Sequence, residues 1–197
     1  MHFEADHIYH VYNRGNNKEK IFFSHDNYVY FLEKIKAEWL QYCNILCYCL
    51  MPNHFHFMLS PKSGGCAYIP HQGQVSHLQV LSKTIGKTLS SYAQAINIQR
   101  GTSGTLFQKK TKAKCLAESS FSLDSNRNYL HHCFWYIHEN PVKAGLCKNK
   151  SDWIYSSWKE YNEPFENGLC DRELAINILG SVMGELEIDE KILAQIW

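Results

Sequence analysis

Residues 45–60 read Ile45-Leu46-Cys47-Tyr48-Cys49-Leu50-Met51-Pro52-Asn53-His54-Phe55-His56-Phe57-Met58-Leu59-Ser60, and this stretch decides the fold. Its first six residues form a short apolar run typical of a buried strand. The next three residues turn the chain, because proline and asparagine favour turns. Residues 54–60 indicate a second strand, so the stretch predicts a β-hairpin.

Further elements are expected before this hairpin. Residues 7–13 alternate in a strand-like way and end at the turn cluster of residues 14–17. Ser24 or Asp26 can cap a helix. The apolar residues of that helix recur at helical spacing, namely Tyr28, Phe31, Leu32, Ile35 and Trp39.

After the hairpin, residues 61–75 are rich in Gly and Pro and predict a loop. Apolar residues at helical spacing indicate a second helix over residues 78–96, which Gly101 to Gly104 should end. Residues 106–116 indicate another strand. A last helix is expected from about Ser125 until Pro141 stops it.

The order strand, helix, strand, strand, helix, strand, helix predicts an α+β fold. Its first six elements match a ferredoxin-like split βαβ unit with one antiparallel sheet and the helices packed on one face. Two short helical stretches are expected at residues 171–179 and 188–197. We therefore expect a domain at 1–158 and an acidic helical C-terminal extension at 159–197.

Composition indicates an ordinary intracellular protein. The chain has 197 residues, 45% of them hydrophobic, which is enough for a real core. Neither a secretory signal nor an apolar run long enough to cross a bilayer is visible, so we expect a cytoplasmic protein without a membrane partner. The eight cysteines include no C-x-x-C pair and are expected to be buried thiols rather than disulfides or zinc ligands.

Charge is distributed unevenly along the chain. Residues 1–159 carry 18 Lys and Arg against 10 Asp and Glu, whereas residues 160–197 carry 2 against 9, which gives formal charges of +8 and −7. A basic body of this kind suits a polyanion such as DNA, although a solvated surface with chance asymmetry is the alternative. The acidic tail either restrains access of such a polyanion to the basic body or is structural.

The pair His54-Phe55-His56 is the most specific chemical feature. Residues i and i+2 of a strand point to the same face, so both imidazoles should converge on the open face of the sheet. Two neutral imidazoles can hold one divalent cation and leave coordination positions open. A purely structural pair is the alternative, and the spacing suits Zn or Fe(II) as well as Mg²⁺ or Mn²⁺.

A tyrosine helix offers a nucleophile and a third ligand. Tyr136 and Asn140 are four residues apart and so share a helix face. The amide oxygen of Asn140 is a hard donor suited to Mg²⁺ or Mn²⁺. A phenol is a weak nucleophile at neutral pH, but a nearby cation favours the phenolate. The alternative is that Tyr136 is simply a half-buried ring.

Three segments in this order resemble the REP-associated tyrosine transposases, which are HUH single-tyrosine enzymes related to the small transposases of single-strand insertion sequences. They are Tyr9-His10-Val11-Tyr12-Asn13-Arg14-Gly15, Leu50-Met51-Pro52-Asn53-His54-Phe55-His56 and Tyr136-Ile137-His138-Glu139-Asn140-Pro141-Val142-Lys143-Ala144-Gly145-Leu146. Leu106-Phe107-Gln108 also fits this family. The likeness spans about residues 7–158 and does not account for the loop at 61–75 or the acidic tail.

The resemblance implies an endonuclease and strand transferase that acts in DNA transposition and recombination. It implies that His54, His56 and Asn140 bind the metal and that Tyr136 becomes joined to the 5′ phosphate of a cleaved strand, which frees a 3′ hydroxyl. The expected partners are single-stranded or hairpin DNA, in a bacterial, nucleoid-associated setting. Some relatives exchange tyrosine helices between subunits and others do not, so a homodimer and the action of Tyr136 in cis or in trans stay open.

Basic residues near these motifs are candidates for DNA contact. They are Arg14, Lys110, Lys112, Lys114 and Lys143, with the three strand lysines on one face by period two. Neutralising about four phosphates would give a salt slope near −3 for single-stranded DNA. Two rival functions remain: a domesticated protein that binds hairpin or single-stranded DNA without strand transfer, and a two-histidine metal-dependent hydrolase or oxygenase.

Overall fold

A computed structural model describes residues 1–71, 74–117, 123–162 and 167–180. One four-stranded antiparallel sheet organises these residues, with strand order β2-β3-β1-β6. The strands are β1 (Ile8–Arg14), β2 (Cys43–Met51), β3 (His54–Pro61) and β6 (Lys112–Ala117). The principal helices are α1 (His25–Trp39), α3 (Val80–Arg100) and α4 (Leu123–Lys143). The α+β fold class and the split βαβ order of the sheet are confirmed.

The predicted hairpin of β2 and β3 sits at one side of the sheet and pairs Met51 with His54 across the turn. Strand β1 then pairs with β3 so that Tyr12 lies opposite His56 and His10 lies opposite Met58. On its other edge β1 pairs with β6, with Lys112 opposite Tyr12 and Lys114 opposite His10. The two central strands therefore carry the histidines.

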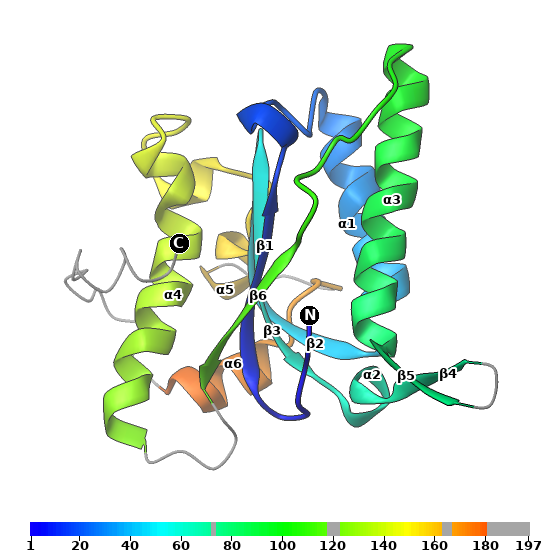
Figure 1. Cartoon of the computed structure of the whole chain (residues 1–197). Helices are drawn as coiled ribbons and strands as arrows, with labels where there is room; N and C mark the ends of the chain where they lie inside the picture. The colour runs from blue at the N-terminus through cyan, green and yellow to red at the C-terminus, as the bar shows by residue number, and fades with distance from the viewer. Residues whose placement is uncertain (72–73, 118–122, 163–166, 181–197) are drawn as a thin grey trace.

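Helices cover both faces of the sheet, which Figure 1 views along its edge. Helices α1 and α3 pack on the face that carries Phe55 and Phe57 of β3. Helix α4 lies on the opposite face, where Cys133 and Ile137 pack against Met58. The expectation of helices on one face thus holds for α1 and α3 alone, because α4 has its own apolar stripe to bury.

The segment predicted as a loop at 61–75 is more regular than expected. It contains the single-turn helix α2 (Ser63–Cys66) and the strand β4 (Tyr68–His71), which pairs with β5 (Gln74–Gln79). Gly65 explains part of this, since a Cβ at that position would lie 2.4 Å from the carbonyl oxygen of Tyr42. Glycine here permits close packing rather than disorder of the backbone.

Two further boundaries differ from the prediction. Strand β6 begins at Lys112, while Phe107 makes only an isolated bridge to Gly15. Helix α4 continues through Pro141 to Lys143. Proline removes only one donor near the helix end, and Gly145, at φ 68°, supplies the left-handed residue that terminates it.

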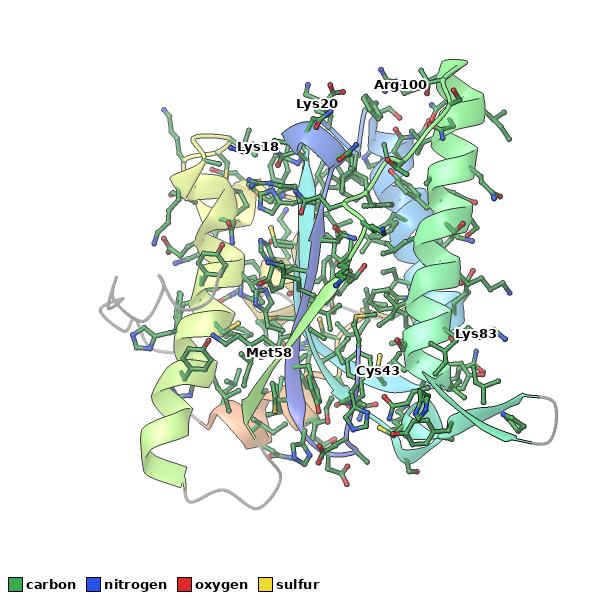
Figure 2. The ribbon with its side chains drawn as sticks, in the orientation of Figure 1. Lys18, Lys20, Cys43, Met58, Lys83 and Arg100 are labelled. Atoms are coloured by element: carbon green, nitrogen blue, oxygen red, sulfur yellow. The ribbon has the colours of Figure 1, made fainter. Side chains whose placement is uncertain are left out.

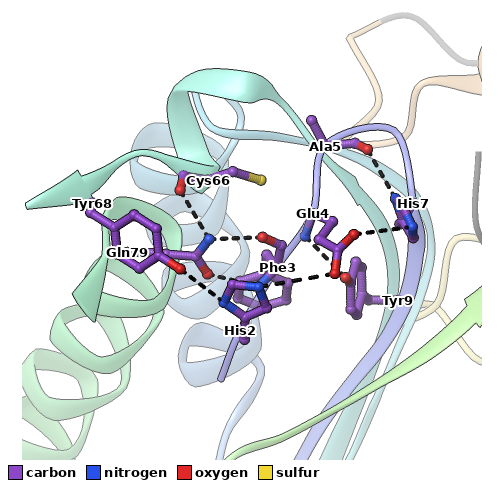
Figure 3. Close-up of polar contacts among 9 residues, drawn as sticks. All are labelled: His2, Phe3, Glu4, Ala5, His7, Tyr9, Cys66, Tyr68 and Gln79. Carbon is purple, nitrogen blue, oxygen red and sulfur yellow. Dashed lines mark hydrogen bonds and ion pairs between the residues drawn. The ribbon is translucent and has the colours of Figure 1, made fainter. Parts of the chain in front are cut away.

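The N-terminal residues are fastened to the start of α3 (Figure 3). The Gln79 side chain accepts a hydrogen bond from the Phe3 amide and donates to the Phe3 carbonyl, both at 2.7 Å, and also donates to the Cys66 carbonyl at 2.9 Å. Phe3 is buried beneath these contacts. This network lies at the end of the sheet away from the turn of the β2–β3 hairpin.

The described part of the C-terminal region packs on the second core. Helix α5 (Trp158–Asn162) buries Tyr161, whose hydroxyl donates to the Leu46 carbonyl. Helix α6 (Arg172–Leu179) matches the helix predicted at 171–179 and buries Ala175 and Leu179. The helix predicted at 188–197 lies outside the described residues. Within those residues, none of the helices is long and apolar enough to cross a membrane.

Candidate active site

The two motif histidines lie on the α4 face of β3. His54 and His56 are both buried, and their ring centroids are 4.9 Å apart with ring planes at 85°. Phe55 points to the opposite core, as strand alternation requires. The two imidazoles share one face, as predicted, but that face is not open: α4 covers it and both rings are buried.

Asn53 orients the first imidazole. Its Oδ1 lies 2.6 Å from Nδ1 of His54, and its Nδ2 donates to the Lys18 carbonyl at 3.1 Å. An amide oxygen only accepts, so Nδ1 of His54 carries the hydrogen and Nε2 of the neutral ring carries the lone pair. This arrangement is typical of a histidine that binds a metal through one ring nitrogen, while its other ring N–H donates a hydrogen bond to an oxygen atom.

A third histidine contacts the second imidazole. Nε2 of His10, on β1, lies 2.9 Å from Nδ1 of His56, and the two rings stack with centroids 5.0 Å apart. Either nitrogen can be the donor, depending on the tautomer. His10 itself is completely buried, and its ring also stacks with that of Tyr12, with centroids 4.6 Å apart.

Tyr136 of α4 faces this histidine cluster within the same chain. The centroid of its ring is 5.5 Å from that of His56 and 6.4 Å from that of His10, each with planes at 79°. Asn140 lies one turn later, and its Nδ2 donates to the Tyr136 carbonyl at 2.8 Å. Because α4 continues past Pro141, Asn140 keeps the same helix face as Tyr136.

The surroundings of the phenol act in opposite directions on its acidity. Burial raises the pKa of the Tyr136 phenol above its ordinary value, while hydrogen bonding to Asn140 and the positive charge of Arg14 lower it. Burial dominates, so the phenol is protonated at neutral pH. Stabilising its anion would require a further positive charge in the site.

Burial also keeps the three imidazoles neutral. It lowers the pKa of His54 to about 4, helped by Arg14 and partly offset by a hydrogen bond with Asn140. The pKa of His10 falls to about 3 for the same reason, with Lys114 contributing, and that of His56 is depressed well below its ordinary value. Neutral imidazole is the form that binds a metal ion.

The predicted basic residues fall into four places. Arg14 ends β1 close to His54 and His56, whose pKa values its charge lowers. Lys112 and Lys114 lie on the histidine face, and their ammonium groups are 6.0 Å from the Tyr12 ring and 5.2 Å from the Tyr129 ring. Lys110 precedes the strand and lines a cavity with Arg14, whereas Lys143 is exposed at the end of α4.

The donors present could hold a divalent cation. Across the described part of the chain, no group of three or more His, Cys, Asp or Glu is arranged to hold a metal. His54, His56 and Asn140 are not such a group, because asparagine is not one of these four residue types. They offer two imidazole nitrogens and one amide oxygen as possible ligands. The tautomer that Asn53 imposes on His54 supports this fit.

Sequence reasoning missed two residues of the site. His10 gave a detectable signal, because it lies two residues before Tyr12 on a predicted strand and so shares its face. Asn53 was interpreted as a turn residue and as part of a motif, without a role of its own, although it directly precedes the histidine pair. His10 contacts Nδ1 of His56, and Asn53 contacts Nδ1 of His54.

Comparison with known proteins establishes the fold. Among solved structures, the chain is similar to a REP-associated tyrosine transposase bound to a REP hairpin, with a TM-score of 0.56 and 17% sequence identity. The alignment covers 96% of this chain and 97% of that one. No family model and no curated protein sequence matches the chain. The likeness therefore rests on the α+β architecture with its four-stranded antiparallel sheet.

Proposed function

We propose that the protein is an endonuclease and strand transferase acting on single-stranded or hairpin DNA, with Tyr136 as its nucleophile. The observation that carries this proposal is the meeting of Tyr136, His56 and Asn140 on one face of the sheet. A role confined to packing would not require a neutral histidine pair beside a phenol. The similarity to a transposase that binds a DNA hairpin supports the same class of substrate.

The chemical step exchanges one phosphodiester for another. The Tyr136 oxygen attacks a backbone phosphorus, a bond forms between them, and the bond from phosphorus to the 3′ oxygen breaks. The phenol proton is lost and the departing 3′ oxygen gains a proton, so the products are a 5′-phosphotyrosine and a 3′ hydroxyl. Because the bond energy is retained in the phosphotyrosine, a second 3′ hydroxyl can reverse the step and join a new strand.

Each residue of the chain has a distinct task in this scheme. His54, His56 and Asn140 would hold Mg²⁺ or Mn²⁺, which when bound supplies charge that favours the phenolate and polarises the phosphate. Arg14 contributes a permanent positive charge beside the phenol and the phosphate. His10 orients His56, and Asn53 orients His54, each by a hydrogen bond at Nδ1 of the motif histidine.

A covalent-capture experiment tests the proposal. A labelled hairpin with random single-stranded flanks is incubated with the protein and Mn²⁺, and adducts that resist denaturant are resolved on a gel. Wild-type protein should give a labelled adduct, and Tyr136→Phe should give none. The captured strands also reveal the preferred sequence. A folded wild-type protein that binds the hairpin but never forms an adduct would instead identify a binding protein.

A further inference from the structure

A cationic cavity opens beside His54, at the end of the sheet where the β2–β3 hairpin turns. Its volume is about 530 Å³. Its charged lining residues are Arg14, Lys18 and Lys20. We call it the loop cavity, because the last two come from the loop that follows β1.

Its charge is not neutralised from within. In the described residues, no Asp or Glu lines the loop cavity, and neither Lys18 nor Lys20 forms an ion pair. Glu19 lies between them in sequence and lines a different cavity, which Lys20 also borders. A concave site with a single sign of charge attracts an anion.

The remaining walls suit a nucleotide rather than a bare anion. Met51, Pro52, Ala144 and Leu146 provide an apolar surface next to the cations. A sugar or base can pack on such a surface while its phosphate contacts the ammonium groups. The cavity thus offers both kinds of contact that one unit of a single strand presents.

The loop that carries the lysines is held in an unusual conformation. Asn17 and Lys18 have φ values of 52° and 63°, a left-handed conformation that residues other than glycine seldom adopt. Asn53 fixes the loop by donating to the Lys18 carbonyl, and its other side-chain atom contacts His54. Strain maintained in this way is common at binding sites. One amide therefore connects the lysine loop to the histidine pair.

Arg14 links the loop cavity to a second one. The second cavity, of about 150 Å³, lies on the β6 side and is lined by Tyr12, Arg14, Lys110 and Lys112, with Asn13 and Gln108. Arg14 is common to both cavities and acts electrostatically on His54, His56 and Tyr136. Cationic surface therefore extends to both sides of the histidine pair.

We propose that the loop cavity is a subsite for a backbone phosphate of the DNA single strand, next to the phosphate that Tyr136 attacks, with Lys18 and Lys20 as its ligands. The inference rests on the proposed function for the nature of the strand. The subsite adds Lys18 and Lys20 to the residues that contact DNA. It also defines a path for the strand, from the lysine loop past His54 and Arg14 toward Lys110 and Lys112.

The test compares two variants of equal charge. Lys18→Asn/Lys20→Gln removes the cations of the loop, and asparagine tolerates the left-handed backbone at position 18. Lys83→Gln/Lys87→Gln removes two exposed cations of α3, and Lys83 lies at the other end of the molecule from Lys18 and Lys20 (Figure 2). Binding of a fluorescent single strand is measured by anisotropy in EDTA across a range of salt concentrations.

We expect the loop variant to lose about 25-fold in affinity at 0.1 M salt and to reduce the salt slope by about 1.4, because each single-strand contact contributes about 0.7 to the slope. The α3 variant should behave like the wild-type protein. Equal losses in both variants, or no loss in the loop variant, would overturn the subsite. Circular dichroism melting confirms that each variant is folded.

Replacing single phosphates of the strand by neutral methylphosphonates locates the contact. One replacement should weaken binding to the wild-type protein and have no effect on the loop variant. Binding in EDTA does not require cleavage, so an absent covalent adduct with an altered salt slope would refute the enzyme and keep the subsite. An adduct with an unaltered slope would do the reverse.

Discussion

Nε2 of His10 lies 2.9 Å from Nδ1 of His56, so one of these nitrogens donates a hydrogen bond to the other. If His56 donates, its Nε2 carries the lone pair that a cation needs. If His10 donates, Nδ1 of His56 is the acceptor. Nε2 of His56 then carries the hydrogen and does not bind a metal. A bound cation would therefore select the first arrangement, with His10 as the acceptor.

Replacing His10 should weaken metal binding without DNA being present. His10→Leu removes the acceptor, and we expect its affinity for Mn²⁺ to fall by about 10- to 100-fold, as is typical when a residue that orients a metal ligand is lost. His10→Gln keeps an acceptor oxygen and should recover part of the affinity. Titration followed by electron paramagnetic resonance measures both. Equal affinities for Leu and Gln, in folded proteins, would show that His10 does not orient His56.

Asn140 should act as an oxygen ligand rather than as a helix residue alone. Asn140→Asp preserves a hard oxygen donor and is expected to bind Mn²⁺ at least as well as wild type. Asn140→Leu should bind about tenfold more weakly or worse, because a hard oxygen donor is lost. Calorimetry with metal alone distinguishes them. Indistinguishable affinities would remove Asn140 from the metal site.

Stability should fall on mild acidification because of His138. Its ring contacts the Phe134 carbonyl at 3.0 Å and the Ser157 hydroxyl at 2.8 Å, and burial lowers its pKa to about 3. The unfolded state binds the proton first, near pH 6.5, so stability is complete above that pH and declines toward pH 3. The slope for this group is at most about 1.4 kcal/mol per pH unit.

The His138→Gln variant provides the control for that acid sensitivity. Urea unfolding at several pH values should show a shallower decline for the variant than for wild type between pH 6 and pH 4. Parallel curves would mean that His138 is not the group responsible. Burial also lowers the pKa values of His10, His54 and His56, which adds to the decline in the same sense, so the difference between the two curves is the quantity to compare.

Deleting residues 160–197 should destabilise the protein. The deletion removes the buried side chains of Tyr161, Ala175 and Leu179, and it removes the hydrogen bond from the Asp171 amide to the Ile45 carbonyl on β2. We expect a loss of about 5 kcal/mol or more, since large buried side chains each contribute a few kcal/mol. Denaturant unfolding measures it. A truncated protein of undiminished stability that binds DNA more tightly would instead support a restraining tail.

The hairpin and the direction of its histidines could be predicted because strand alternation is a local rule. Phe55 and Phe57 identify the apolar face, so His54 and His56 must occupy the other. Contact between His10 and His56 could not be predicted in the same way. It depends on the register of β1 against β3, which places Tyr12 opposite His56 and brings His10 to it diagonally.

The errors at the helix end and at the strand start have different origins. Pro141 was expected to end α4, yet a proline in the last turn removes only one hydrogen bond, and Gly145 supplies the actual terminus. Lys110 was assigned to a strand with Lys112 and Lys114, but pairing with β1 begins only at Lys112. Tertiary pairing sets the start of β6, and strand propensity does not describe such pairing.

The central claim, that Tyr136 is the nucleophile, is tested most directly by finding where DNA becomes attached. The adduct formed with Mn²⁺ is digested with nuclease and trypsin, and the modified peptide is sequenced by mass spectrometry. Cleavage after Arg127 and Lys143 gives one peptide that contains both Tyr129 and Tyr136, so Tyr129 is an internal control. We predict a nucleotide on Tyr136 alone. A nucleotide on Tyr129, or on Tyr12, whose ring centroid is 5.9 Å from that of His56, would contradict the account.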